Sequence, residues 1–257
     1  MRHLTDWRDW RRWIPAECPG CGRRQPGQGL CAQCAGRLAG DPSVPRCRRC
    51  AHPLAAGPCP DCPPGPPACD RIIAAFDYAG LGRTLVHDYK VRRRLSLAGL
   101  LADQLAQAVR RADGMAPRPP DWVVPVPAHR AALRLRGFSP PAELARLLAR
   151  HLGLACRLDA VRRVRDGPKQ AVLGRARRLR AQAGAYACGA DAAGARVVIV
   201  DDVLTTGATM RAVAGALRAA GAERVDGWVL ARALRRDPRE DGDGVAADAG
   251  DGRPGRR

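Results

Sequence analysis

The sequence predicts an α/β protein, with a mainly parallel sheet flanked by helices and preceded by a small cysteine-rich module. Val197–Val200 is a short β-branched run, which is typical of a buried parallel strand. Gly221 stands where the C-terminal cap of a following helix is expected. The apolar residues of that helix recur at the spacing i, i+3, i+4 and i+7: Met210, Val213, Ala214 and Leu217. Upstream, eight cysteines gather between positions 18 and 62.

The rest of the chain alternates between the same two patterns. Further strands are expected over residues 72–78, 122–127 and 224–230. Further helices are expected over residues 81–94, 97–111 and 141–151. Four regions follow: a tryptophan-rich segment over 1–15, the cysteine-rich module over 16–66, a domain built on the sheet over 70–236, and a tail over 237–257. The tail lacks apolar periodicity and is expected to be disordered.

The composition favours anionic ligands. The formal charge is +19, and of the 44 basic residues only Lys90 and Lys169 are lysines. Such a charge attracts phosphates or nucleic acid. The two lysines mark sites that need a compact ammonium, or they survive by chance in an arginine-rich chain.

Apolar runs and the N-terminal segment indicate where the protein is located. No run of 18 apolar residues occurs, so no membrane span is expected. The N-terminus lacks the apolar stretch of a signal peptide, which makes the cytoplasm the expected location. Trp7, Trp10 and Trp13 are expected to pack on the chain's own surface, with a partner or membrane surface as the alternative.

The segment after Val200 has the chemistry of a sugar-phosphate site. Asp201 and Asp202 are carboxylates that can accept hydrogen bonds from neighbouring ribose hydroxyls. A turn of small and hydroxyl-bearing residues then leads into the helix, where exposed backbone N–H groups and the positive helix end suit a phosphate dianion. The turn residues are Thr205, Thr206, Gly207, Ala208 and Thr209. The alternative is a purely structural strand whose acid pair leads into a helix.

All thirteen positions from 197 to 209 resemble the phosphoribosyl-diphosphate (PRPP) signature of type I phosphoribosyltransferases. The resemblance implies that fold for residues 70–236, with Asp201 and Asp202 on the ribose and the turn on the 5-phosphate. It also implies Mg²⁺ bound together with PRPP, bridging the pyrophosphate oxygens.

The same resemblance suggests two further parts of the site. The loop after the first core strand would bind pyrophosphate, which makes His129, Arg130, Arg134 and Arg136 candidates; a solvated basic loop is the alternative. The basic segment 162–186 would supply a hood that closes over the substrate and excludes water, and a plain exposed helix is its alternative. The hood candidates are Arg165, Lys169 and Gln170.

The cysteine-rich module has the spacing of a double zinc ribbon. Four Cys-x-x-Cys knuckles are present, and two knuckles supply the four thiolates of a tetrahedral structural zinc site. A disulfide framework is the alternative for this metal-dependent segment. The simplest pairing takes the knuckles in order, and crossed pairing stays open. The two resulting sets are Cys18, Cys21, Cys31 and Cys34, then Cys47, Cys50, Cys59 and Cys62. The isolated Cys156 and Cys188 are expected to be structural.

Four knuckles followed by this core resemble the ComF family of competence-associated proteins. The stretches that carry the resemblance are 124–127, 134–138, 165–173, 177–178 and 185–186, with Lys90 after the first helix. The chain departs from the family pattern at Ser139-Pro140, in place of Asn-Gln, and at Ala181, in place of Asn.

The resemblance implies a PRPP-binding protein linked to DNA uptake in natural transformation, and three functions are compatible with it. The first is a working transferase in which an unidentified acceptor attacks the ribose carbon. The second is a non-catalytic accessory protein that keeps the pocket and binds single-stranded DNA or a DNA-uptake helicase. The third is a nucleobase salvage enzyme. Only two Phe and three Tyr are present, which disfavours base stacking on single strands.

Overall fold

The structure is a computed structural model that describes residues 15–41, 43–54, 56–62, 64–113, 118–164 and 184–234. Three of the sequence-based expectations lie outside these residues. They are the tryptophan segment, the tail over 237–257, and the hood candidates Arg165, Lys169 and Gln170.

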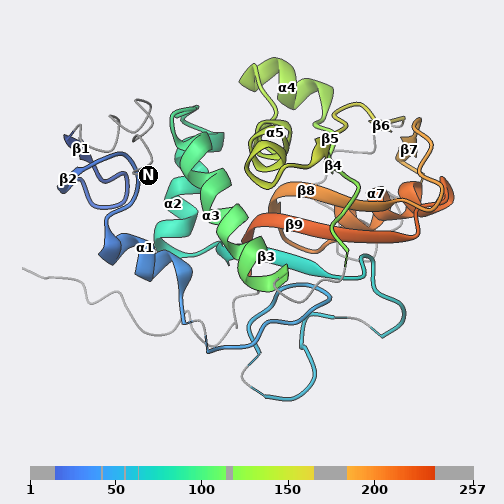
Figure 1. Cartoon of the computed structure of the whole chain (residues 1–257), viewed down its shortest axis with the longest axis horizontal. Coiled ribbons are helices and arrows are strands. Elements are labelled where there is room, and N and C mark those ends of the chain that lie inside the picture. Colours follow the sequence, from blue (N-terminus) through green and yellow to red (C-terminus); the bar gives the residue numbers. More distant parts are fainter. Residues whose placement is uncertain are drawn as a thin grey trace, which may run out of the picture.

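The centre of the molecule is a five-stranded sheet in which every strand pair is parallel (Figure 1). In spatial order the strands are β3 (Ile72–Asp77), β9 (Arg224–Arg232), β8 (Arg196–Leu204), β4 (Trp122–Pro125) and β5 (Ala155–Cys156). This confirms the predicted α/β class with its mainly parallel sheet. The strand predicted over 197–200 continues to Leu204, because its pairing with β9 extends through Asp201 opposite Val229.

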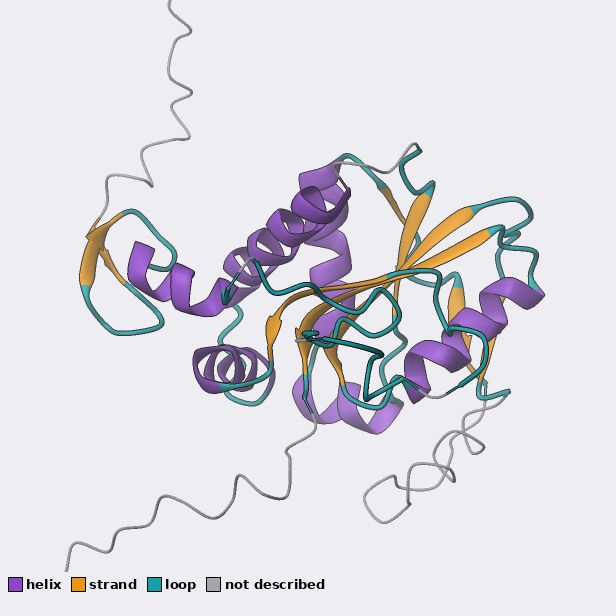
Figure 2. Cartoon of the chain, turned by 90° about the horizontal axis from the view of Figure 1, so that it is seen from below, coloured by secondary structure: helices purple, strands orange, loops and turns teal. Residues whose placement is uncertain are grey.

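Helices cover both faces of the sheet (Figure 2). One face packs against α2 (Gly80–Lys90), α3 (Leu97–Asp113) and α5 (Pro140–Leu152). The other face packs against α7 (Ala208–Ala219) and the antiparallel pair β6 (Val161–Arg163) and β7 (Tyr186–Cys188). Alternate residues of each strand feed the two cores, as the period of a strand requires: Val198 and Val200 face α5, and Val197 and Ile199 face α7.

Local sequence explains where these helices begin and end. The Ser139 hydroxyl accepts a hydrogen bond from the N–H of Ala142, and Pro140 and Pro141 occupy the first turn of α5. The two residues that depart from the family pattern, Ser139 and Pro140, are therefore the N-cap and the first residue of α5. Gly221, with φ 89°, ends α7 as expected: its N–H donates to the carbonyl of Arg218, and the N–H of Ala222 donates to that of Leu217.

The cysteine-rich module forms two lobes against the sheet domain. The first consists of β1 (Pro15–Glu17), the antiparallel β2 (Arg24–Pro26) and α1 (Ala32–Ala39), and α1 contacts α2 and β3 (Figure 1). The second lobe has an isolated bridge between Arg46 and Pro53 and buries Ala51 in the core on the α7 side.

Candidate functional site

The carboxyl ends of the parallel strands meet around a cavity of about 450 Å³. Parallel sheets of this kind bind ligands at that edge. Four residues of the acid pair and the following turn line the cavity: Asp201, Asp202, Thr205 and Thr209. Seven further residues that line it lie in or next to β3, α2, β4, β6, β7 and β8: Tyr78, Lys90, Val126, Pro127, Arg163, Tyr186 and Val203.

The two acids are held by the backbone and by a lysine. Oδ1 of Asp201 accepts a hydrogen bond from the N–H of Asp202 at 2.8 Å, and Oδ1 of Asp202 accepts one from the N–H of Val203 at 2.8 Å. Oδ2 of Asp202 lies 2.6 Å from Nζ of Lys90. Burial and the neighbouring Asp202 charge raise the pKa of the Asp201 carboxyl well above its usual value.

Lys90 is a site residue that the motif alone did not reveal. It stands at the last position of α2, and 28% of its side chain is exposed. The only signal in the sequence was its retention as lysine in an arginine-rich chain and its match to a family position. The neighbouring basic residues Arg92 and Arg94 pair with Asp88 instead. Lys90 thus forms the ion pair with the acid pair, through Asp202.

The turn between β8 and α7 is built around Gly207. Gly207 has φ 73°, a left-handed conformation that glycine adopts without steric cost, and it stands directly before the first residue of α7. The N–H of Ala208 donates to the Thr206 hydroxyl. Among the described residues, none accepts a hydrogen bond from the backbone N–H groups of Thr205, Thr206 or Gly207. Such amides beside a helix N-terminus can bind an anion.

A buried arginine binds the backbone carbonyls at the start of this turn. Nη1 of Arg232, the last residue of β9, donates to the carbonyls of Leu204 at 3.0 Å and of Thr205 at 2.6 Å. The Arg232 side chain is buried. One guanidinium therefore fixes the path of the backbone that leads into the turn.

The residues expected to bind pyrophosphate lie on a short helix, α4 (Arg130–Arg136), where a loop was predicted. Nδ1 of His129 caps this helix by accepting a hydrogen bond from the N–H of Ala131. None of His129, Arg130, Arg134 and Arg136 lines the cavity, although α4 begins shortly after Pro127, which does. Within the described residues the basic groups that reach the cavity are Lys90 and Arg163. Arg163 extends toward Tyr186, with its guanidinium carbon 5.7 Å from the ring centroid.

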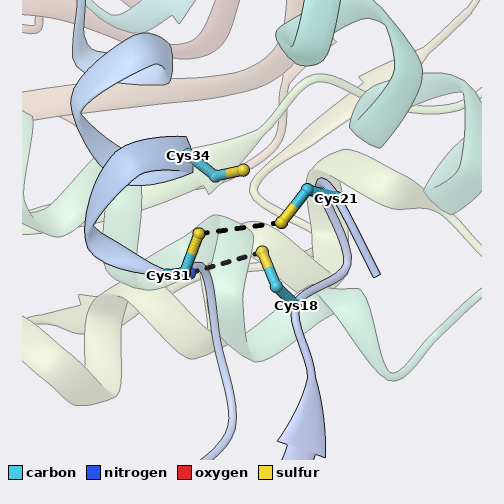
Figure 3. Close-up of side chains that lie close together, drawn as sticks. All are labelled: Cys18, Cys21, Cys31 and Cys34. Atoms are coloured by element: carbon cyan, nitrogen blue, oxygen red, sulfur yellow. Dashed lines mark hydrogen bonds between the residues drawn. The ribbon is translucent and has the colours of Figure 1, made fainter. Parts of the chain in front are cut away.

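The first four cysteines point their sulfur atoms toward one another (Figure 3). The Sγ atoms of Cys18, Cys21, Cys31 and Cys34 all lie within 4.8 Å of one another, and those of Cys21 and Cys31 are 3.8 Å apart. Tetrahedral zinc with Zn–S bonds of about 2.3 Å places its sulfurs about 3.8 Å apart. Burial opposes ionisation of Cys18, but hydrogen bonds from the N–H groups of Cys31, Gly20 and Cys21 outweigh it and lower the pKa of Cys18 to about 6. This cluster is compatible with structural zinc.

The other four cysteines form a second cluster of the same kind. The Sγ–Sγ distance is 3.7 Å between Cys47 and Cys62 and 3.4 Å between Cys50 and Cys59, and all four atoms lie within 4.8 Å of one another. The knuckles thus pair in order along the chain, not in the crossed arrangement. All eleven cysteines are free thiols, so the alternative of a disulfide framework finds no support. Cys69 is fully buried, and Cys156 and Cys188 are partly buried.

Comparison with known proteins agrees with this architecture and places the chain among proteins with a phosphoribosyltransferase domain. The model of the family described as "Phosphoribosyl transferase domain" matches residues 136–246. The "DNA utilization protein YhgH" of Salmonella typhimurium is 35% identical over 80% of this chain and 91% of its own length, and that of Escherichia coli K12 is 33% identical over the same shares. "Competence protein F" of Haemophilus influenzae is 28% identical over 84% of this chain and 90% of its own. The chain belongs to the ComF family.

Solved structures add a partial likeness. Glutamine PRPP amidotransferase from B. subtilis is 24% identical over 56% of this chain and 30% of its own, with a TM-score of 0.38.

Within the ranges that the structure describes, no helix has the length and apolar character needed to cross a membrane.

Proposed function

We propose that this protein binds PRPP, or a related phosphoribosyl ligand, in the cavity at the carboxyl edge of the sheet. The observation that carries the proposal is that one cavity is lined by an acid pair, a lysine and a turn before a helix, in which the backbone amides of Thr205, Thr206 and Gly207 have no hydrogen-bond acceptor among the described residues. The acids suit ribose hydroxyls, and the turn suits a phosphate. A phosphoribosyl ligand meets both demands in one molecule.

In this proposal each residue has a separate role. Asp201 and Asp202 accept hydrogen bonds from the 2- and 3-hydroxyls, while Lys90 holds Asp202 in place through its Oδ2. The turn from Thr205 to Thr209 surrounds the 5-phosphate. Mg²⁺ bound with the ligand would offset the charge of the pyrophosphate oxygens.

Transfer would follow from the same geometry. When the pyrophosphate leaves, negative charge develops on it and positive charge on the ribose carbon. Cationic groups at the cavity, Lys90 and Arg163, are in place to stabilise the leaving group. Arg130 and the other residues of α4 stay candidates for the same role from just outside the cavity.

The test is calorimetric titration of PRPP with Mg²⁺ into the purified full chain. We expect Asp201→Asn with Asp202→Asn to weaken binding by at least about tenfold, because each charge-assisted hydrogen bond contributes about 1.5–3 kcal/mol. Asp159→Asn is the matched control, since this exposed acid lies outside the cavity. Unchanged affinity in the double variant would refute the assignment. A screen of nucleobases and DNA for pyrophosphate release then separates a transferase or salvage enzyme from a binding protein.

We further propose a role in DNA handling, with zinc in both cysteine clusters. The names of the relatives, a DNA utilization protein and a competence protein, favour this role, and the charge of +19 is consistent with it. The logarithm of the binding constant for a labelled single strand should fall linearly with the logarithm of the salt concentration. If moderate salt abolishes binding altogether, the charge acts non-specifically, and a helicase or another protein becomes the partner to seek.

A further inference from the structure

A buried ion pair joins the second cysteine cluster to the sheet domain. Nη2 of Arg232 lies 2.5 Å from Oδ2 of Asp61, and both side chains are only 4% exposed. Asp61 stands between the cluster residues Cys59 and Cys62, and it is 171 positions from Arg232. The pair is therefore a direct connection between a candidate metal site and the last residue of β9.

The other atoms of the two side chains extend this connection in both directions. Nη1 of Arg232 donates to the carbonyls of Leu204 and Thr205, where the turn begins. Oδ2 of Asp61 also lies 3.1 Å from Nδ1 of His52. The chain of contacts thus runs from the knuckle, through the carboxylate and the guanidinium, to the backbone of the turn.

The energetics of burial make this arrangement sensitive to its geometry. A buried ion pair repays its desolvation only when the two groups keep excellent hydrogen-bonding geometry. The position of Asp61 depends on the knuckle, because metal binding to Cys59 and Cys62 fixes the backbone on both sides of it. Loss of the metal would release the carboxylate, and Arg232 would lose the partner that orients it toward the turn.

A cavity of about 300 Å³ shows how close the cluster and the turn are. Its lining includes Cys50, Asp61 and Cys62 from the module and Thr205, Thr206 and Gly207 from the turn. The first cluster differs: the structure shows its lobe in contact with α2 and β3, and no described ion pair joins it to the turn.

We propose that metal binding at Cys47, Cys50, Cys59 and Cys62 positions the phosphate-binding turn through Asp61 and Arg232. Metal and phosphoribosyl ligand then bind cooperatively, while the first cluster is independent of the ligand. This inference rests on the proposed function, because it assigns the ligand to that turn. Thermodynamic reciprocity gives it a second consequence: if the metal raises the affinity for the ligand, the ligand raises the affinity for the metal by the same factor.

The experiment measures zinc transfer from the loaded full chain to a chromophoric chelator, with and without ribose 5-phosphate. This probe has the phosphate and the ribose hydroxyls and needs no Mg²⁺. We expect one of two zinc ions per chain to be retained about fivefold or more tightly in its presence, the lower end of typical coupling between sites. Cys21→Ser, which damages only the first cluster, should leave a single, ligand-sensitive zinc.

Variants of the ion pair test the route. Asp61→Asn should keep both zinc ions but lose the effect of ribose 5-phosphate on their release, and Asp61→Glu should restore part of it. Asp41→Asn is the matched control: the carboxylate of this exposed acid of the same module accepts hydrogen bonds from the N–H and the hydroxyl of Ser43. The measurement on the unmodified chain stands even if a variant fails to fold.

The outcomes separate this inference from the one on which it rests. If calorimetry shows that ribose 5-phosphate binds and zinc release is unchanged, the coupling is refuted and the proposed ligand stands. If neither ribose 5-phosphate nor PRPP binds the zinc-loaded chain, both proposals fall. Equal protection of both clusters would also refute the coupling through Asp61.

Discussion

The ammonium of Lys90 lies 2.6 Å from Oδ2 of Asp202, at the point where α2 ends and β8 reaches the cavity. This contact compensates the buried one of two adjacent carboxylates. Desolvation and the neighbouring charge of Asp202 raise the pKa of Asp201, the other member of the pair. The two acids of the motif therefore have different electrostatic surroundings.

Replacing Lys90 by Met should destabilise the fold and weaken ligand binding. The carboxylate of Asp202 is buried and would lose its cation, while the lysine is partly exposed, so we expect a loss of about 1–3 kcal/mol in the free energy of unfolding. Denaturant unfolding and PRPP calorimetry measure the two effects. Arg83→Gln removes a positive charge from an exposed position of the same helix and serves as the control. Equal effects of the two variants would contradict a specific role for Lys90.

Asp201→Asn should stabilise the unliganded protein at neutral pH while weakening its ligand. The folded-state pKa of this carboxyl lies above its unfolded value of 3.8, so the wild type loses stability as the pH rises through the window between the two. Asn carries no charge and escapes this loss. We expect an unfolding midpoint about 2–4 °C higher at pH 7, and no difference below the unfolded pKa. A variant that is less stable at pH 7 would contradict the raised pKa.

Gly207→Ala tests the conformation of the turn. The added Cβ meets ordinary contact distances, with Leu204 Cδ1 at 3.8 Å, so the cost comes from φ 73° and not from crowding. A left-handed conformation costs an L-residue about 1–2 kcal/mol, which thermal unfolding can measure. Gly215→Ala, within α7 and with open space around it, should instead stabilise by about 0.5–1 kcal/mol. Opposite signs for the two variants are the expected result.

Metal analysis of the purified chain should find about two zinc ions, one for each cluster. Cys34→Ser and Cys50→Ser should each reduce the content to about one, and Cys69→Ser, a buried thiol outside both clusters, should leave it unchanged. Zinc loss should unfold the lobes, since they have few apolar residues of their own. Elemental analysis and circular dichroism check these expectations. Full zinc content in the Cys50 variant would refute the second site.

The elements that the sequence predicted correctly are those marked by a pattern of neighbouring residues. The β-branched run before Asp201 and the helical spacing after Gly207 placed β8 and α7, and the knuckle spacing placed both cysteine clusters. The end of β8 was predicted too early, because Asp201 and Asp202 interrupt the apolar run. Backbone pairing with β9 carries the strand on regardless of the side chains.

Other features have no local signal. Helix α4 buries none of its residues, so it has no apolar period, and it forms where the His129 cap and the left-handed Gly137 delimit it. The contacts of Lys90 with Asp202 and of Asp61 with Arg232 join distant segments, so a single sequence cannot indicate them. The proposed roles of the pyrophosphate and hood residues stay predictions.

The strand order has a consequence for how the protein is made. Among the described strands β9 comes last in the chain, yet it lies between β3 and β8, and no other described strand pairs with β3. A nascent chain that ends before Arg224 would therefore leave β3 without its partner strand. The ion pair of the buried Asp61 likewise cannot form until Arg232 has left the ribosome. The five-stranded sheet can therefore be completed only after β9 has emerged, although the cysteine lobes precede it in the chain.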